Sequence, residues 1–242
     1  MKHTSIVDVV DSVEQNPATR VTTMEWRESL ANTKALPSKR VLDLVLTSLI
    51  LVGLSPFLVL IMLAIKIGSS GPVLHRQIRL GKKGRPFVFY KFRSMYDDRN
   101  DAEHRSYVNN LIKAGSSYRA GQNGELLFKI YDDGRVTRVG KLIRKYSVDE
   151  FPQLFNVLRG EMSLVGPRPP LPYEYEDYSN WHRKRLDGIP GITGLWQVNG
   201  KNTVPFEKMV QLDIHYLKNW SLWLDIKIIL RTIPVILKGE GC

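Results

Sequence analysis

The sequence predicts an α+β fold: a re-entrant helix-break-helix in the membrane, a small β-hairpin, and several short or amphipathic helices at the membrane interface. Three observations support this prediction. Residues 44–65 carry no charge, residues 72–92 contain two apolar runs around a glycine turn, and the later chain shows short helical patterns separated by glycine and proline. We divide the chain into a polar leader (1–38), flexible or interfacial, a re-entrant membrane helix (39–67), and a cytosolic domain with membrane-interface helices (68–242).

Charge and cysteine content narrow the classes of partner. The chain has 242 residues, a net charge of +11 and one cysteine, Cys242. A basic excess of this size favours nucleic acid, an anionic membrane surface or phosphorylated substrates, although a lysine-rich solvated surface gives the same count. A single cysteine excludes an intrachain disulfide, and the five histidines show no zinc-type spacing.

The uncharged stretch is predicted to enter a membrane. A straight helix over residues 44–65 would rise roughly 33 Å, enough to cross a bilayer core of about 30 Å. A cleaved signal peptide is excluded, because the stretch begins well inside the chain and no small-residue cleavage site follows it. A helix in the core of a soluble protein is normally shorter and amphipathic.

Two features favour a helix that enters and leaves the membrane by the same face. Ser55 and Pro56 lie in the middle of the stretch, where proline removes a helical hydrogen bond and favours a kink. Basic residues, which prefer the cytoplasmic side, flank both ends. They are Lys34, Lys39 and Arg40 before the stretch, and Lys66, Arg76, Arg79, Lys82, Lys83 and Arg85 after it. A kinked helix that crosses the membrane remains the alternative.

The rest of the chain is predicted to contain a hairpin and short helices. The hairpin spans 72–92 with its turn at Gly81–Gly84, and a surface helix plus loop covers 97–124. Helices follow near 140–145 and after Asp149, the latter ending at Gly160, a typical C-terminal cap. Two further helices are expected at 205–218 and 222–238. The last is apolar over much of its surface, so both a membrane-interface and a core position are open.

The candidate chemical groups are cations around a pair of adjacent carboxylates. The carboxylates are Asp149 and Glu150, and the cations are Lys91, Arg93, Arg144 and Arg168. A reaction at a diphosphate needs cations to hold the phosphates, commonly a magnesium ion, and an activated nucleophile, for which an aspartate is suitable. A structural alternative exists, because Ser147 to Glu150 also fits a helix capping box. A P-loop is excluded, since the spacing after Gly134 is wrong and Leu142 replaces the required hydroxyl.

In their order and spacing, seven motifs resemble the bacterial sugar transferases, the monotopic polyprenyl-phosphate phosphoglycosyl transferases. The resemblance covers roughly residues 39–238. The motifs are Lys39-Arg40-Val41-Leu42-Asp43, Ser55-Pro56, Lys91-Phe92-Arg93-Ser94-Met95, Arg135-Val136-Thr137-Arg138-Val139-Gly140, Asp149-Glu150-Phe151-Pro152-Gln153-Leu154, Met162-Ser163-Leu164-Val165-Gly166-Pro167-Arg168-Pro169 and Pro190-Gly191-Ile192-Thr193-Gly194-Leu195-Trp196-Gln197-Val198. Phe151 stands where leucine is usual, a departure that bears on the choice of sugar and not on the catalytic pair.

The resemblance implies a reaction and a set of roles. Asp149, paired with Glu150, would attack the β-phosphate of a UDP-sugar, release UMP and carry a covalent sugar phosphate, which polyprenyl (undecaprenyl) phosphate would then take. Mg²⁺ is the implied cofactor, bound at Asp149. Lys91, Arg93, Arg144 and Arg168 match the basic residues around the phosphates. The resemblance also implies that the membrane helix breaks at the Ser55-Pro56 step.

The implied setting is the bacterial cytoplasmic (inner) membrane, with the catalytic domain on the cytoplasmic face and no nucleic-acid partner. The sugar is expected to be galactose or glucose, with an N-acetylated sugar as the alternative, and the product would begin a surface polysaccharide such as an exopolysaccharide or lipopolysaccharide. The sequence leaves the oligomeric state open, a homo-oligomer included. A non-catalytic basic membrane protein would match the charge and the apolar stretch equally well. It gives no reason for the carboxylate pair and Arg168 to occur together.

Overall fold

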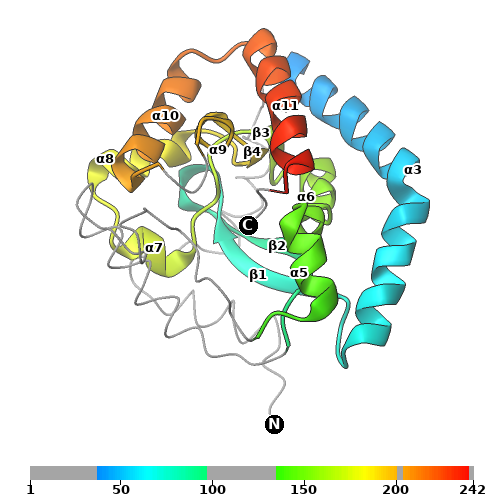
Figure 1. Cartoon of the computed structure of the whole chain (residues 1–242). Helices are drawn as coiled ribbons and strands as arrows, with labels where there is room; N and C mark the ends of the chain where they lie inside the picture. The colour runs from blue at the N-terminus through cyan, green and yellow to red at the C-terminus, as the bar shows by residue number, and fades with distance from the viewer. Residues whose placement is uncertain (1–36, 97–134, 201–203, 240–242) are drawn as a thin grey trace. The chain divides into compact units, whose positions relative to one another are not determined.

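A computed structural model describes residues 37–96, 135–200 and 204–239 (Figure 1). In chain order the elements are α3 (Pro37–Gly68), β1 (Leu74–Leu80), η1 (Lys82–Gly84), β2 (Pro86–Phe92), α5 (Arg138–Lys145), η3 (Val148–Glu150), α6 (Gln153–Arg159), β3 (Ser163–Val165), α7 (Pro172–Glu176), α8 (Asn180–Arg183), η4 (Lys184–Asp187), β4 (Gly191–Thr193), α9 (Leu195–Val198), α10 (Phe206–Lys218) and α11 (Leu222–Leu237). The predicted leader up to residue 36 and the surface helix predicted within 97–124 lie outside the described residues.

Helix α3 is continuous where a break was predicted. Its 32 residues are helical throughout, and Pro56 lies inside the helix. Ser55 Oγ donates to Val52 O, 2.9 Å away, which supplies a local hydrogen-bond partner next to the proline. Figure 1 shows that the helix bends partway along its length. The prediction of a helix-break-helix is therefore corrected to one bent helix, since a proline kink does not require the helix to stop.

The faces of α3 are inverted relative to a soluble amphipathic helix. Its buried residues near the start are the polar Lys39, Asp43 and Thr47, which recur every four residues and so share one face. Large apolar side chains are exposed along the remaining length, and only 6% of its most apolar stretch is buried. In water such an arrangement exposes apolar surface while burying polar groups. It is the arrangement expected when lipid surrounds the apolar faces.

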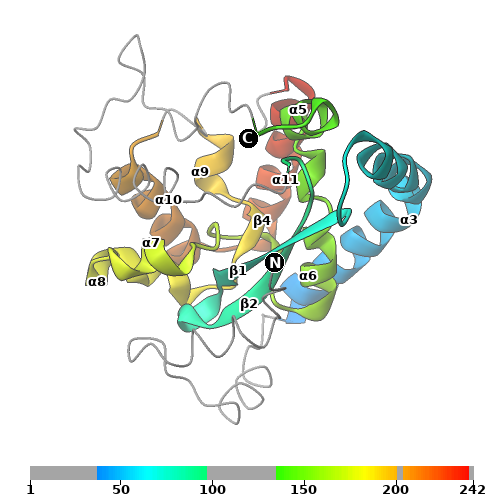
Figure 2. The same cartoon turned by 90° about the horizontal axis from the view of Figure 1, so that it is seen from below.

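The predicted hairpin is confirmed. β1 and β2 pair antiparallel, from Leu74 opposite Phe92 to Leu80 opposite Pro86. Phe87 and Phe89 point into the main core, as the two-residue period of a strand requires. The side chain of Asn156 on α6 binds the backbone of β2, donating to Val88 O (2.6 Å). α6 thereby lies against β2 on one side and against α3 on the other (Figure 2).

A second, parallel strand pair was not predicted. β3 and β4 pair in the register Ser163–Gly191 and Val165–Thr193. Each strand has three residues, too few for a periodic pattern to identify. Gly191 is required by the close approach, because a Cβ there would lie 2.0 Å from Gly166 N.

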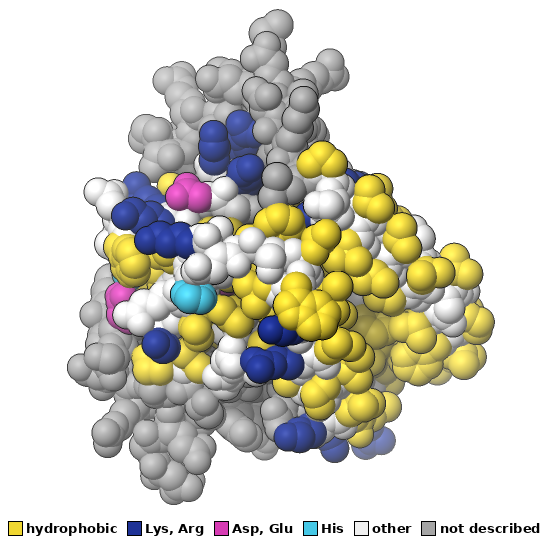
Figure 3. Space-filling model, turned by 90° about the horizontal axis from the view of Figure 1, so that it is seen from above, with side chains coloured by type: hydrophobic (Ala, Val, Ile, Leu, Met, Phe, Trp, Pro, Cys, Tyr) yellow, Lys and Arg dark blue, Asp and Glu magenta, His cyan; other side chains and the backbone are white. Residues whose placement is uncertain are grey.

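The predicted C-terminal helices are confirmed as α10 and α11, and the predicted helix end at Gly160 is confirmed by its left-handed φ of 82°. α11 buries Asp225 and Ile228 and exposes several large apolar side chains, among them Trp223 (62% exposed) and Leu237 (72%). Figure 3 shows apolar side chains gathered over α11 and α3 on one face of the molecule. α11 therefore belongs to the core on one side and presents an apolar surface on the other.

Candidate active site

The carboxylate pair lies in the short helix η3, directly after α5. Ser147 adopts the left-handed conformation (φ 54°, ψ 22°), which turns the chain sharply between the two helices. Its side chain forms no cap hydrogen bond, so the capping box considered from the sequence is not formed. Asp149 is buried, with 5% of its surface exposed, whereas Glu150 is half-buried and lines a pocket. The two adjacent carboxylates therefore differ in exposure, Asp149 being the more buried.

Lys91 joins the hairpin to this pair. It lies near the end of β2, and its Nζ is 3.1 Å from Glu150 Oε1 and 3.8 Å from Asp149 Oδ2. The ammonium group also lies over the Phe89 ring, 5.7 Å from the centroid, and Arg79 lies 5.2 Å from the same ring. These contacts hold Lys91 beside both carboxylates, although 59 residues separate it from Glu150.

The burial of Asp149 has an electrostatic consequence. Loss of water around the carboxyl raises its pKa to about 6, and the negative charge of Glu150 adds to the rise, while Lys91 and Arg144 oppose it. At neutral pH most molecules still carry the carboxylate. A poorly solvated carboxylate next to cations is suited to nucleophilic attack on phosphorus.

Arg144 reaches Asp149 from the last turn of α5. It is close enough to lower the pKa of Asp149. The position of α5 is set at its start, where Gly140 lies against the backbone of Ser94, and a Cβ on Gly140 would be 1.9 Å from Ser94 O. Thr137 caps the helix by accepting from Gly140 N. Glycine at this position therefore lets α5 approach the chain just after β2.

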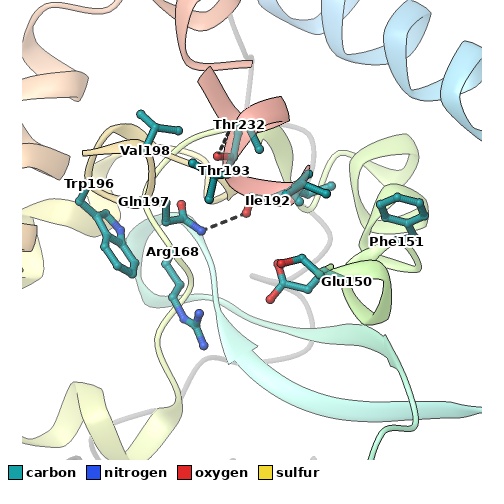
Figure 4. A pocket seen from close by; sticks show the side chains of 12 residues that line it. Glu150, Phe151, Arg168, Ile192, Thr193, Trp196, Gln197, Val198 and Thr232 are labelled. Atoms are coloured by element: carbon teal, nitrogen blue, oxygen red, sulfur yellow. Dashed lines mark hydrogen bonds between the residues drawn. The ribbon is translucent and has the colours of Figure 1, made fainter. Parts of the chain in front are cut away.

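Arg168 lies on a segment whose backbone is held from two sides. Gly191 N donates to Pro167 O (2.9 Å), and the buried Arg79 donates through Nη1 to Pro169 O (2.9 Å). Burial, together with the charge of Arg168, lowers the pKa of Arg79 to about 10. The flanking prolines further restrict the Arg168 backbone. Figure 4 shows Arg168 and Glu150 reaching the same pocket from different elements.

The pocket beside the carboxylates has mainly apolar walls. It is lined by Ser147, Glu150, Phe151, Arg168, Ile192, Thr193, Trp196, Gln197, Val198, Thr232, Val235 and Ile236. The contribution of α11 was missed from the sequence, because its apolar pattern suits a core, a membrane interface and a pocket wall equally well. Five further lining residues lie between Ile192 and Val198. They belong to the motif at residues 190–198, to which the sequence analysis had assigned no role in a pocket.

Arg93 is placed apart from the other predicted cations. Its Nη2 donates to Ser69 O (2.7 Å) and to Ser69 Oγ (2.9 Å), just beyond the end of α3. A Cβ on Gly71 would meet the Arg93 guanidinium at 2.3 Å, so the side chain packs tightly against that loop. The structure therefore brings Lys91, Arg144 and Arg168 towards Asp149 and Glu150, while Arg93 holds the end of the long helix.

The two carboxylates fit a magnesium ion shared with a substrate. Among the described residues no group of three or more acidic, histidine or cysteine side chains is arranged to hold a metal. Mg²⁺ commonly binds proteins through one or two carboxylates and completes its shell with substrate phosphates and water. Asp149 and Glu150 supply that donor set.

Comparison with known proteins gives matches over most of the chain. The family model described as Bacterial sugar transferase matches residues 34–239. Galactosyl transferase CpsE of Streptococcus agalactiae is 47% identical over 174 residues, which are 72% of this chain and 36% of that protein. The undecaprenyl-phosphate galactose phosphotransferase of Salmonella typhimurium is 40% identical over 215 residues, 89% of this chain and 44% of that protein.

A third relative is similar in length. The exopolysaccharide production protein ExoY of Sinorhizobium fredii is 39% identical over 204 residues, which are 84% of this chain and 87% of the relative. The chain thus spans less than half of the streptococcal and Salmonella relatives and most of the rhizobial one.

Proposed function

The chain belongs to the bacterial sugar transferase family, and we propose that it transfers a hexose 1-phosphate from a UDP-sugar to undecaprenyl phosphate. The observation that carries this proposal is the buried carboxylate of Asp149, with Lys91, Glu150 and the Arg168 pocket around it. Relatives named for galactose transfer and for undecaprenyl phosphate support the two substrates. The product would be the first lipid-linked sugar of a surface polysaccharide.

In the first step an Asp149 carboxylate oxygen attacks the β-phosphorus of the UDP-sugar. The bond between that phosphorus and the bridging oxygen breaks, and UMP leaves with the electron pair. Lys91 and Arg168 are the cations that would hold the diphosphate and offset the charge that develops on it. The enzyme then carries the sugar phosphate as an acyl phosphate on Asp149.

In the second step an oxygen of undecaprenyl phosphate attacks the same phosphorus. The bond from phosphorus to the Asp149 oxygen breaks, which regenerates the carboxylate and releases undecaprenyl diphospho-sugar. Glu150, held 3.1 Å from Lys91, keeps that cation close to Asp149 in both steps. No proton has to be removed from the lipid phosphate when it attacks as the anion.

Asp149 and Glu150 would also hold a Mg²⁺ ion. When bound, the ion supplies charge neutralisation to the phosphates of the substrate. Lys91 and Arg144 act on the nucleophile itself, because both favour the ionised form of Asp149.

We further propose that α3 is re-entrant and that the exposed side of α11 rests on the same membrane face. α3 is roughly 48 Å long by its residue count, and both of its ends contact the same body. Lys39 binds Asp225 near the start, and Ser69, just beyond the end, accepts from Arg93. A helix that crossed the bilayer would place these ends on opposite sides. The bend in α3 instead lets its middle enter lipid while both ends stay at the cytoplasmic face.

The sugar is proposed to be galactose or glucose. Two relatives are named for galactose, and an N-acetylated sugar is the alternative that the experiment includes. Phe151 contributes to the pocket lining next to Glu150, but it packs against the core cluster of Ile65, Phe92, Ile143 and Val148, and Figure 4 shows its ring turned away from Arg168.

The test uses the full chain in lipid nanodiscs with Mg²⁺ and a panel of UDP-galactose, UDP-glucose and two UDP-N-acetylhexosamines. Wild type should release UMP when undecaprenyl phosphate is present. Without the lipid, intact-mass spectrometry should detect one added hexose phosphate on the protein. Asp149→Asn should abolish both signals, whereas Asp187→Asn, which changes an exposed carboxylate outside the pocket, should retain them.

The mechanism and the overall reaction can fail separately. The covalent step would be excluded if UMP is released but no mass adduct forms and the double-reciprocal plots of initial rate for the two substrates intersect. Direct attack by the lipid phosphate would then remain. Absence of UMP release with every sugar would exclude the reaction itself.

A further inference from the structure

Helix α11 contributes side chains both to the pocket beside Asp149 and to the exposed apolar surface. Thr232, Val235 and Ile236 line the pocket. Ile233 and Leu237 point outward, with 50% and 72% of their surfaces exposed. Ile233 and Ile236 are three residues apart and therefore adjacent on the helix surface. Apolar side chains at adjacent positions of α11 thus form an apolar path from the exposed face to the pocket lining.

The hydrogen-bonding groups on the inner wall of this pocket are largely engaged within the protein. Thr193 Oγ1 and Thr232 Oγ1 lie 2.8 Å apart, and Thr232 donates to Ile228 O (2.8 Å). Gln197 donates its amide to Ile192 O (3.1 Å), as Figure 4 shows. With these donors engaged, the wall offers a ligand mainly methyl groups and rings, from Ile192, Val198, Val235 and Ile236.

The charged side chains of the pocket lining are Arg168 and Glu150. Glu150 is paired with Lys91, whose Nζ lies 3.1 Å from Glu150 Oε1, and Arg168 is the cation of the lining. A ligand that is anionic at one end and apolar along its length matches this distribution.

We propose that the apolar wall formed by Val235, Ile236, Ile192 and Val198 binds the first isoprene units of the polyprenyl phosphate, which enters from the membrane around α11 past Ile233. This inference rests on the proposed function and adds to it the route and the subsite of the lipid substrate. The phosphate of the lipid then lies towards Arg168 and Asp149, where the sugar phosphate is transferred.

The other candidate occupant is the uracil of the UDP-sugar. A uracil needs several hydrogen-bond partners in a site that selects it. Trp196 Nε1 and Gln197 Oε1 belong to two of the described residues that line the pocket, and both atoms are buried without a hydrogen-bond partner. Two such atoms are fewer partners than a selective uracil site needs. The apolar path to the exposed side of α11 has no role for a soluble nucleotide, and this favours the lipid.

The test compares steady-state kcat/KM for each substrate in nanodiscs, using undecaprenyl phosphate and the short-chain geranyl phosphate. Val235→Trp fills the pocket wall and should lower kcat/KM for undecaprenyl phosphate tenfold or more, while kcat/KM for the UDP-sugar changes less than twofold. Ile236→Ala removes apolar contact without adding bulk and should lower the lipid value by about tenfold. Gln211→Trp, which puts the same new side chain on the exposed face of α10, should leave both values unchanged.

A second readout is the preference for chain length. Wild type should use undecaprenyl phosphate better than geranyl phosphate, and Val235→Trp should reduce that preference. An equal loss in kcat/KM for the UDP-sugar would assign the pocket to the nucleotide and overturn the proposal, as would unchanged values for both substrates in both pocket variants. A wild-type protein that releases no UMP from any UDP-sugar would instead overturn the proposed function.

Discussion

Lys39 Nζ lies 2.6 Å from Asp225 Oδ2, and this buried ion pair joins the first turn of α3 to the first turn of α11. Asp225 also accepts from Tyr216 (2.6 Å) and from Trp220 (3.0 Å), and Lys39 donates to Val165 O (3.0 Å). The two helices with the most exposed apolar surface are thus fixed to each other through a satisfied polar cluster. The proposal that α3 and α11 rest on the same membrane face depends on this contact.

We expect Lys39→Met to destabilise the protein by about 3 kcal/mol, because it leaves Asp225 buried without its cation. Thermal unfolding in detergent measures the loss. The double variant Lys39→Met/Asp225→Asn should recover part of it, since the remaining amide carries no charge. Lys208→Met on the exposed face of α10 is the matched control, and an equally small loss in both single variants would contradict the role of the pair.

The pH dependence of the reaction should report the ionisation of Asp149. Its raised pKa of about 6 predicts that kcat/KM for the UDP-sugar falls towards tenfold per pH unit below about pH 6 and is level above it. Lys91 lowers this pKa, so Lys91→Met should move the acid limb to higher pH in addition to lowering the rate. If the acid side of the pH profile stays at the same pH in Lys91→Met, Lys91 does not act on the ionisation of Asp149.

Replacing Asp149 should stabilise the fold at neutral pH. The pKa of Asp149 is raised from 3.8 to about 6 on folding, so its contribution to stability is complete below about pH 4 and is lost as pH rises through 6. At pH 7.5 in metal-free buffer, Asp149→Asn should therefore unfold with a free energy about 1–3 kcal/mol higher than wild type. Denaturant unfolding at pH 4.5 and 7.5 measures this. The gain should shrink at the lower pH, and a constant difference would exclude the ionisation as its cause.

Arg93 and Arg168 should behave differently when each is replaced by methionine. Arg93→Met removes the contacts to Ser69 and should lower the free energy of unfolding by about 1–3 kcal/mol. Arg168→Met should reduce turnover at least 100-fold with a smaller change in stability, since the side chain faces the pocket. Thermal unfolding and UMP release, measured on both variants, distinguish the roles. If Arg93→Met is stable but binds the UDP-sugar poorly, Arg93 binds the substrate phosphates, as the sequence analysis expected.

The candidate site was partly predictable because its members carry distinctive chemistry in short motifs. Asp149 and Glu150 stood out as adjacent acids among basic residues, and Lys91 and Arg168 as cations compatible with phosphate. The walls of the pocket were not predictable, because Val235 and Ile236 look like any apolar residues of an amphipathic helix. Arg93 was grouped with Lys91, Arg144 and Arg168 because its position matches a basic residue of the family, and its contact with Ser69 depends on tertiary packing, because β2 ends at Phe92 and Ser69 lies beyond α3.

By itself, the sequence determined the long apolar helix, the hairpin, the two C-terminal helices and the adjacency of the two carboxylates. Each of these depends on local hydropathy, local periodicity or adjacent residue types, which a linear pattern records. Only the tertiary structure decided that α3 stays helical through Pro56, that β3 pairs with β4, and that α11 forms a wall beside Asp149. These outcomes depend on contacts between residues far apart in the chain, such as Lys39 with Asp225, whose energies arise only when the segments are brought together.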